Sequence, residues 1–367
     1  MHINRDAGDA IMFILAKSSL NISEVHKNEI ANYGIDKSLI ITFLFMVALI
    51  TNFSVSATDY NSGSLALTID NDSLVGTDRE YSSGVYLKLF SKSEVNQNKF
   101  NRVIRPIFNL LPLHDESQKV WGIYLGQQIW TPTDISIADE VKNDRPYSGR
   151  LAMKVHINEY TSSYANKYSL MIGYVGPKSL AEQAQKTIHK FINSPEPMGW
   201  DKQINDKLIY SINAEARRGI TREAGWFNRE VDASYVGRVK ISNFQSEIAI
   251  GGTARWGANL KESFGSVSAI PGAFIDPSAL STSKNGYFTY LSLEARYRHN
   301  DYTIEGGRPE HLYNVSVAHW QSTLATGMVY YKQSWGAACS FAVSTRNFQE
   351  DKLNHNTIAS LEVFWRM

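Results

Sequence analysis

The sequence predicts an all-β protein, an antiparallel transmembrane β-barrel of about twelve strands with a short helix in an outer loop. Three observations predict it: segments of about ten residues that alternate apolar and polar side chains, charge throughout one of the two faces, and a signal-like segment ahead of them. Alternation with period two places the two kinds of side chain on opposite faces of a strand. In a transmembrane barrel the apolar face meets lipid and the lumen accepts charge, a combination that a soluble sandwich does not normally show.

The alternation is clear in the segment where Leu208, Tyr210 and Ile212 alternate with Ser211 and Asn213. Strands of this length span a bilayer when they are tilted, and only a closed barrel satisfies their backbone hydrogen bonds in hydrocarbon. The twelve predicted strands are 64–70, 84–90, 120–130, 150–160, 166–176, 207–217, 230–241, 244–256, 287–300, 321–331, 334–346 and 356–366.

Five long connections separate these strands, at 100–117, 131–147, 177–206, 259–286 and 301–319. Transmembrane barrels have short periplasmic turns and long outer loops, so we expect the long connections at the outer rim. The third of them contains one convincing helix, within residues 179–200. A barrel of this size has a narrow lumen largely filled by side chains. We therefore expect a functional site on the wall rather than a channel through which solutes diffuse freely.

Composition excludes several classes of protein. The chain has 37 Lys and Arg against 36 Asp and Glu, so its net charge suggests neither nucleic acid nor another polyanion as a partner. A single cysteine, Cys339, allows no intrachain disulfide and excludes a disulfide-stapled secreted fold. Neither a phosphate-binding glycine loop nor a metal-type Cys/His spacing occurs in the sequence.

The first part of the chain has the pattern of a secretory signal peptide. Lys37 precedes an apolar run at 39–50, and Val55 and Ala57 form a small-x-small cleavage pattern. The run is too short for a confident spanning helix. We therefore expect residues 37–57 to be a signal peptide and 58–367 to be the barrel domain with its active-site loops. Residues 1–36 have no clear period, and we interpret them as a non-native extension from a start codon assigned too far upstream.

Three polar stretches differ from ordinary barrel wall, at 69–84, 143–149 and 176–201. The third contains the predicted helix. Gln185 and His189 stand four residues apart, so they project from the same helix face. The apolar stripe that we expect to support the helix consists of Leu180, Ala184, Ile188 and Ile192. Taken alone, this pattern also fits a surface helix whose polar face carries a histidine.

Together the three stretches resemble the lipid A 3'-O-deacylase family of Gram-negative outer-membrane barrels. The resemblance runs from about Ala66 to the C-terminus and is densest between Asn71 and Gln203. It implies a site near the outer-leaflet boundary and calcium-dependent hydrolysis of the 3'-linked acyloxyacyl ester of lipid A. Lipid A or lipopolysaccharide would then be the substrate and outer-membrane lipid the surroundings, and we expect a monomer in the Gram-negative outer membrane.

The functional residues of the family can be carried onto this sequence one by one. Its Asn-Asp pair falls on Asn71 and Asp72, its hydroxyl residue on Ser82, its helix glutamine on Gln185 and its essential histidine on His189. The acidic residue after the helix is replaced, because Pro195 occupies that position and Glu196 stands next to it as a substitute.

Two features depart from the family pattern. Residues 133–140 contain no Lys or Arg, whereas the family has adjacent basic residues there that face the substrate head group; Lys142 or Arg145 could compensate. The chain also ends in Met367 instead of the aromatic residue usual for such barrels. The first departure puts the head-group preference in doubt more than the chemistry.

The residues suggest a mechanism for ester hydrolysis. His189 is a suitable general base because an imidazole titrates near neutral pH, and Gln185 could orient it or the attacking water. Asp72, with oxygen ligands from Asn71, backbone carbonyls or Glu196, suits Ca²⁺, which would polarise the ester carbonyl. Ser82 could hydrogen-bond the water or the oxyanion.

Several alternatives remain open at this stage. Ser82 could be a nucleophile with His189 as its base. The structural alternatives are that Asp72 caps a turn, that Gln185 is solvated, and that Asp144 and Arg145 form a lumenal ion pair. For the whole protein, the alternatives are an outer-membrane phospholipase and a non-catalytic, porin-like barrel.

Overall fold

The computed structural model describes residues 63–72, 80–96, 98 and 105–366. The described residues belong to one compact unit. The predicted N-terminal extension at 1–36 and signal peptide at 37–57 lie outside the described residues, as does Met367.

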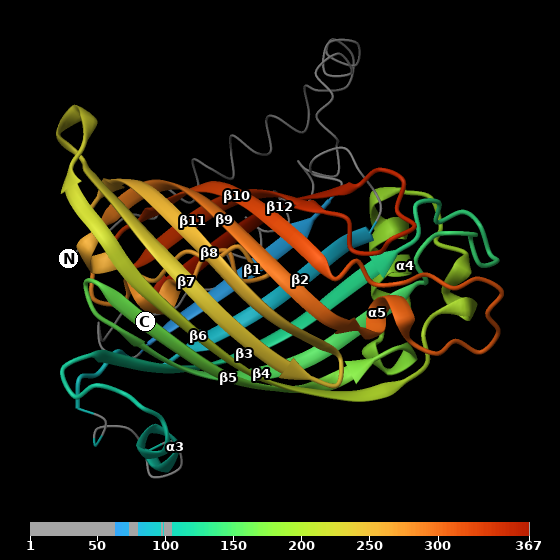
Figure 1. Ribbon diagram of the computed structural model, residues 1–367, viewed down its shortest axis with the longest axis horizontal. Coiled ribbons are helices and arrows are strands. Elements are labelled where there is room, and N and C mark those ends of the chain that lie inside the picture. The colour runs from blue at the N-terminus through green and yellow to red at the C-terminus, as the bar shows by residue number, and fades with distance from the viewer. Residues whose placement is uncertain (1–62, 73–79, 97, 99–104, 367) are drawn as a thin grey trace, which may run out of the picture. The chain divides into compact units, whose positions relative to one another are not determined.

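The described residues form a closed barrel of twelve antiparallel strands, in which each strand pairs with the next and β12 closes against β1 (Figure 1). All twelve predicted strands are confirmed. The main differences are that β2 begins at Glu80 and that β6 continues to Ala224. The strands are β1 Ser64–Asn71, β2 Glu80–Phe90, β3 Gln118–Thr131, β4 Ser148–Tyr160, β5 Tyr164–Val175, β6 Lys207–Ala224, β7 Glu230–Ser242, β8 Gln245–Ala258, β9 Gly286–Asp301, β10 Trp320–Tyr331, β11 Trp335–Thr345 and β12 His355–Arg366.

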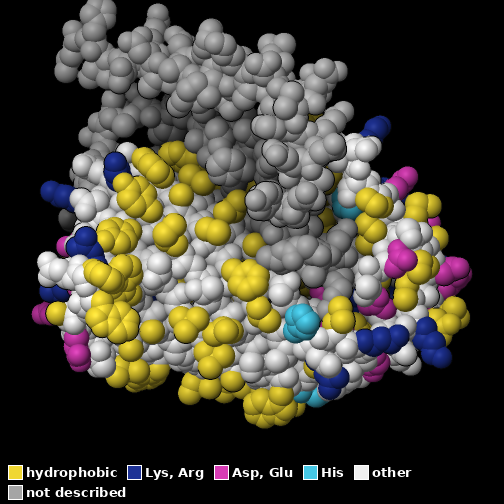
Figure 2. All heavy atoms as spheres, turned by 90° about the horizontal axis from the view of Figure 1, so that it is seen from above, with side chains coloured by type: hydrophobic (Ala, Val, Ile, Leu, Met, Phe, Trp, Pro, Cys, Tyr) yellow, Lys and Arg dark blue, Asp and Glu magenta, His cyan; other side chains and the backbone are white. Residues whose placement is uncertain are grey.

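The two faces of the strands separate as the alternation predicts. On β6, Tyr210 and Ile212 are each 60% exposed on the outside, whereas Ser211 between them is 6% exposed. Cys339 is also on the exposed side. Figure 2 shows hydrophobic side chains gathered over the middle of one face and charged side chains toward its two ends. An apolar band between charged ends is the surface that a bilayer requires of a barrel. None of the helices in the described residues is both long and apolar enough to cross a membrane.

The connections between strands lie at two ends of the barrel. The loop end carries the helices α4 (Ala181–Ile192) and α5 (Tyr302–Glu305), and the terminal end carries Ser64, Arg366 and the helix α3 (Arg105–Leu110) (Figure 1). The strand order places connections 132–147, 176–206 and 302–319 at the loop end, but 91–117 and 259–285 at the terminal end. Our expectation that all five long connections lie at one rim is therefore wrong for two of them.

The connection 259–285 does not project from the barrel but fills part of its lumen, so we call it the plug. Phe264, Val267 and Phe274 of the plug are buried in the same core cluster as side chains of the wall. Its backbone is tied to the wall because Arg217 donates to the carbonyl of Val267 over 2.8 Å. At Asp276 the carboxylate accepts a 2.7 Å hydrogen bond from Tyr160. The apolar side chains of this long segment are stable at the terminal end because they are buried in the lumen and not exposed to water.

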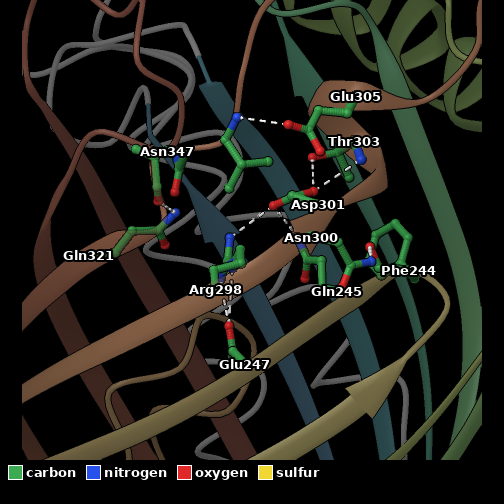
Figure 3. Close-up of polar contacts among 12 residues, drawn as sticks. Phe244, Gln245, Glu247, Arg298, Asn300, Asp301, Thr303, Glu305, Gln321 and Asn347 are labelled. Atoms are coloured by element: carbon green, nitrogen blue, oxygen red, sulfur yellow. Dashed lines mark hydrogen bonds and ion pairs between the residues drawn. The ribbon is translucent and has the colours of Figure 1, made fainter.

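Charged side chains fill much of the remaining lumen in pairs. Figure 3 shows Arg298 of β9 between Glu247 and Asp301, at distances of 2.9 Å to each carboxylate. Gln245 donates to Asp301 as well, over 2.7 Å. The carboxylate of Asp301 also accepts from Thr303 and so caps α5. Buried charges are stable only when they are paired and hydrogen-bonded, and these contacts meet that need. Because Asp301 contacts both Arg298 of the wall and Thr303 of α5, the network also joins the wall to the loop end. His156 and Arg217 are also buried.

Candidate active site

The helix α4 lies against the wall at the start of β4. Glycine at position 149 makes this contact possible: a Cβ there would lie 2.1 Å from the Cβ of Ala181 and 2.3 Å from the hydroxyl of Ser179. Gln127 of β3 donates to the carbonyl of Ser179 over 2.8 Å and fixes the entrance to the helix. The helix is shorter than the predicted helical stretch, because Asn193 adopts a left-handed conformation and ends it.

Gln185 holds α4 in place through a tryptophan. Its side-chain oxygen accepts a 2.9 Å hydrogen bond from the indole of Trp200, and Gln185 is only 4% exposed. Trp200 packs on Tyr147 with ring centroids 4.9 Å apart, and the hydroxyl of Tyr147 donates to the carbonyl of Ile135 over 3.0 Å. Gln185 is therefore not solvated, and among the described residues its amide contacts Trp200 rather than His189.

His189 lies on the face of α4 that turns toward the barrel, two turns after Ala181 and one turn after Gln185. Its side chain is partly exposed, and its Nδ1 lies 2.6 Å from the carbonyl oxygen of Pro195. A carbonyl only accepts, so Nδ1 carries the proton and Nε2 has the lone pair in the neutral imidazole. The arrangement leaves a basic ring nitrogen at a partly open edge of the helix.

Only part of the predicted apolar stripe of α4 faces the protein. Ala184 packs against the buried cluster that contains Tyr147, Ala181 and Trp200, whereas Leu180 is 55% exposed and Ile188 is 47% exposed. The prediction that the stripe supports the helix against the protein is therefore wrong for Leu180 and Ile188. A helix at the rim of a membrane barrel can turn apolar residues toward lipid, so the polar face becomes the one that meets the wall.

Ser82 occupies an irregular position in β2. Tyr81 pairs with Trp130 and Ser83 pairs with Ile129, so Ser82 is the extra residue of a β-bulge. A bulge re-aims the side chain it carries, and here the hydroxyl of Ser82 lies 2.5 Å from that of Thr131, with either group able to donate. The bulge places Ser82 at the loop end, two strands from the start of β4 where α4 lies. Among the described residues, no hydrogen bond joins Ser82 to His189.

Asn71 and Asp72 end β1 at the same rim, and Asp72 is only 1% exposed. Glu196 follows α4 and is exposed. In residues 63–72, 80–96, 98 and 105–366, no three His, Cys, Asp or Glu side chains gather as a metal site would require. Asp72 and Asn71 nevertheless offer the hard oxygen donors that Ca²⁺ prefers, and backbone carbonyls and water commonly complete such a site.

Arg145 forms a buried ion pair at the rim, but its partner is Glu80 rather than Asp144. The guanidinium lies 2.8 Å from the Glu80 carboxylate and donates to the hydroxyl of Thr303 over 2.9 Å. Asp144 instead accepts from the backbone of Thr133 and of Arg145 itself. Arg145 is only 2% exposed, so it cannot compensate for the basic residues that 133–140 lacks.

Two charged side chains of α4, Glu182 and Lys186, form an ion pair one helical turn apart. Glu182 accepts from Lys186 over 2.8 Å, and this hydrogen bond raises the pKa of Lys186 above its ordinary value. The pair is partly exposed to solvent, so we assign it little stability. It leaves Lys190 and His189 as the basic side chains of the last turn, a favourable place for positive charge because the carbonyl end of a helix is partly negative.

Comparison with known proteins identifies the family. The model of the family described as outer membrane protein LpxR matches residues 39–367. The chain belongs to this family. It is a Gram-negative outer-membrane β-barrel protein. A comparison with curated proteins finds no match.

Solved structures agree on the fold. LpxR from Salmonella typhimurium shares 15% sequence identity and superposes with a TM-score of 0.70, covering 83% of this chain and 100% of that chain. The β domain of the Bordetella autotransporter BrkA shares 8% identity with a TM-score of 0.41, over 84% of this chain and 100% of that one. The first comparison supports the twelve-stranded fold, and the second is too distant to support any argument.

The sequence did not point to Trp200 and Thr131, although both hold predicted site residues in place. Trp200 is buried and fixes Gln185, and Thr131 fixes Ser82. The dipeptide Gly199-Trp200 could have indicated Trp200. A Cβ on Gly199 would lie 2.6 Å from the ring of Tyr147, so glycine at this position allows the chain beside Trp200 to approach that ring. Thr131 gave no such signal.

Proposed function

We propose that this protein is a lipid A 3'-O-deacylase that hydrolyses the 3'-linked acyloxyacyl ester in the outer leaflet. The observation that carries the proposal is His189 on a helix held against the barrel wall, in a chain of the LpxR family. The exposed apolar stripe of α4 gives a lipid acyl chain a surface beside the imidazole. The reaction is then hydrolysis of a carboxylic ester at the boundary between the wall and the membrane.

In this mechanism His189 acts as the general base. The proton on Nδ1 is held by the carbonyl of Pro195, so Nε2 takes a proton from water as that water attacks the ester carbonyl. The imidazolium then gives this proton to the departing 3' oxygen as the ester C–O bond breaks, which leaves a free hydroxyl on lipid A and a released fatty acid. Gln185 is a positioning residue, because it fixes the helix through Trp200. Ser82, with its hydroxyl oriented by Thr131, donates to the water or to the oxyanion.

Mass spectrometry of lipid A tests the proposal. We expect Gram-negative cells that express this protein to lose the mass of the 3' acyloxyacyl group when calcium is present. Release of fatty acid from glycerophospholipid with lipid A unchanged would favour the phospholipase alternative. An unchanged set of envelope lipids, with the barrel folded in the outer membrane, would contradict both. The porin-like alternative is less favoured because the plug and the paired charges occupy the lumen.

We also propose that Asp72 and Asn71 hold a calcium ion, with Glu196 as a further ligand of the loop. Bound calcium would supply Lewis-acid polarisation of the ester carbonyl. Asp72→Asn keeps the size of the side chain and removes its charge, so we expect Ca²⁺ affinity to fall by about tenfold or more. Terbium luminescence and calorimetry measure this without any assay of activity.

A matched control distinguishes a site from general charge. Asp115 is an exposed carboxylate at the terminal end, so Asp115→Asn loses the same charge far from the rim and should bind calcium as the wild type does. Equal calcium affinity in wild type and Asp72→Asn would remove Asp72 from the site. Glu196→Gln, measured in the same way, reports whether the exposed carboxylate takes part.

Gly149→Ala is expected to reduce deacylation while the barrel stays folded. The new methyl group would meet Ala181 and Ser179 at the distances given above, so α4 must move away from β4 and carry His189 with it. A displacement of about 1 Å at a reacting group can cost about 10²-fold in rate. The control is Gly237→Ala, because a Cβ at that outward-facing glycine meets nothing within 4 Å. Equal activity of the two variants would contradict the proposed role of the contact.

A further inference from the structure

A cavity of about 140 Å³ lies inside the barrel between the wall and the tip of the plug. Strands β2 to β8 line it on one side, and plug residues 270–273 line it on the other. A single water needs roughly 10–15 Å³ on this kind of measure, so the cavity holds a small solute together with several waters. It is distinct from the candidate active site, because neither His189 nor Asp72 is among its lining residues.

The lining of this cavity carries positive charge only. Four basic side chains, Arg150, Lys154, Arg238 and Lys240, reach it, and no Asp or Glu is among its lining residues. Arg238 is neutralised from behind by Glu294 at 2.6 Å, and Lys240 lies 3.6 Å from Glu247. In the part of the chain that the structure describes, Arg150 and Lys154 have no carboxylate within ion-pairing distance.

Aromatic rings hold both unpaired cations in fixed positions. The guanidinium of Arg150 lies 5.4 Å from the ring centroid of Phe244 and 6.0 Å from that of Trp130, and its buried Nε makes no hydrogen bond to the described residues. The ammonium of Lys154 lies 4.1 Å over the ring of Tyr124. Cation–π contacts of this kind orient a cation without neutralising it, so its hydrogen-bond donors stay available to an anion.

Neutral donors complete the lining. Ser169, Ser211 and Asn213 contribute short polar side chains from β5 and β6. Two cations without a counter-ion in a lumen are unfavourable, and a tetrahedral oxyanion would relieve that cost by accepting charge-assisted hydrogen bonds from Arg150 and Lys154.

We propose that this cavity binds a small oxyanion of the phosphate type. The chemistry is that of a phosphate group, and the closed wall around the cavity favours a free anion that arrives through water over the head group of a lipid. The site goes beyond the proposed deacylase activity and does not depend on it.

Calorimetry on the full-length, folded protein in a zwitterionic detergent tests the proposal, with inorganic phosphate as the probe and chloride at equal ionic strength as the reference. We expect saturable phosphate binding, and a loss of affinity of about tenfold or more in Arg150→Gln and again in Lys154→Gln. Lys352→Gln removes an exposed positive charge outside the barrel and should leave the affinity unchanged. Heat-modifiable gel mobility verifies that each variant is folded.

Three outcomes would overturn the proposal. They are no saturable phosphate binding to the wild type, equal binding in wild type and both cavity variants, and displacement of bound phosphate by chloride at equal concentration. A parallel titration with short-chain phosphatidic acid distinguishes the source of the phosphate group. Tighter binding of that lipid, lost in Arg150→Gln, would overturn the assignment to a free anion. Because deacylation is measured separately, a failure here is distinguishable from a failure of the proposed enzyme activity.

Discussion

Replacing His189 by alanine is expected to lower the rate of lipid A deacylation by about 10²–10⁴-fold, the usual contribution of a positioned general base. The imidazole is partly exposed and its one hydrogen bond to the described residues goes to the carbonyl of Pro195. Its removal should therefore leave α4 and the barrel intact. Mass spectrometry of lipid A from expressing cells, with calcium present or chelated, measures the effect.

The control for this variant is His311→Ala, which removes an exposed imidazole from the connection 302–319 at the same end of the barrel. It should retain full activity. His189→Gln adds a second measure, because an amide can hydrogen-bond Pro195 but cannot accept a proton near neutral pH. Full activity in either His189 variant would exclude the general-base role and move attention to Ser82.

The barrel itself could be predicted from sequence because its signal is local. Each strand needs only the alternation of its own side chains, such as Tyr210 outward and Ser211 inward, and the membrane then requires closure. The placement of the plug has no local signal. The sequence of residues 259–285 mixes polar and apolar side chains, as other long connections do. These residues fold into the lumen because the closed wall leaves space there for them.

The candidate site shows the same division. Residue types and spacing indicated Gln185 and His189, but not their partners, since Trp200 lies after the helix and Pro195 offers only a backbone oxygen. The orientation of α4 was mispredicted in part, because apolar helix residues normally pack on protein, and here Leu180 and Ile188 lie exposed while Ala184 is packed. Pairings between distant residues, such as Glu80 with Arg145, follow from the registers of β2, β3 and β4 rather than from either local sequence.

Replacing Lys88 by methionine is expected to destabilise the barrel by about 3–5 kcal/mol, the usual cost of leaving a buried charge without its partner. Lys88 of β2 is 0% exposed and forms an ion pair with Glu362 of β12, across β1. In the variant, Glu362 would keep only the 2.6 Å hydrogen bond from Thr68. Urea unfolding followed by tryptophan fluorescence measures the change in the free energy of unfolding.

The double variant Lys88→Met with Glu362→Gln should recover most of this loss, because it removes both charges and leaves an amide that Thr68 can still bond. Lys332→Met, at an exposed position in the turn between β10 and β11, serves as the control and should change stability by less than about 0.5 kcal/mol. A loss below about 1 kcal/mol for Lys88→Met would contradict the need for the buried partner, because Glu362 would then be stabilised by water or by protonation instead.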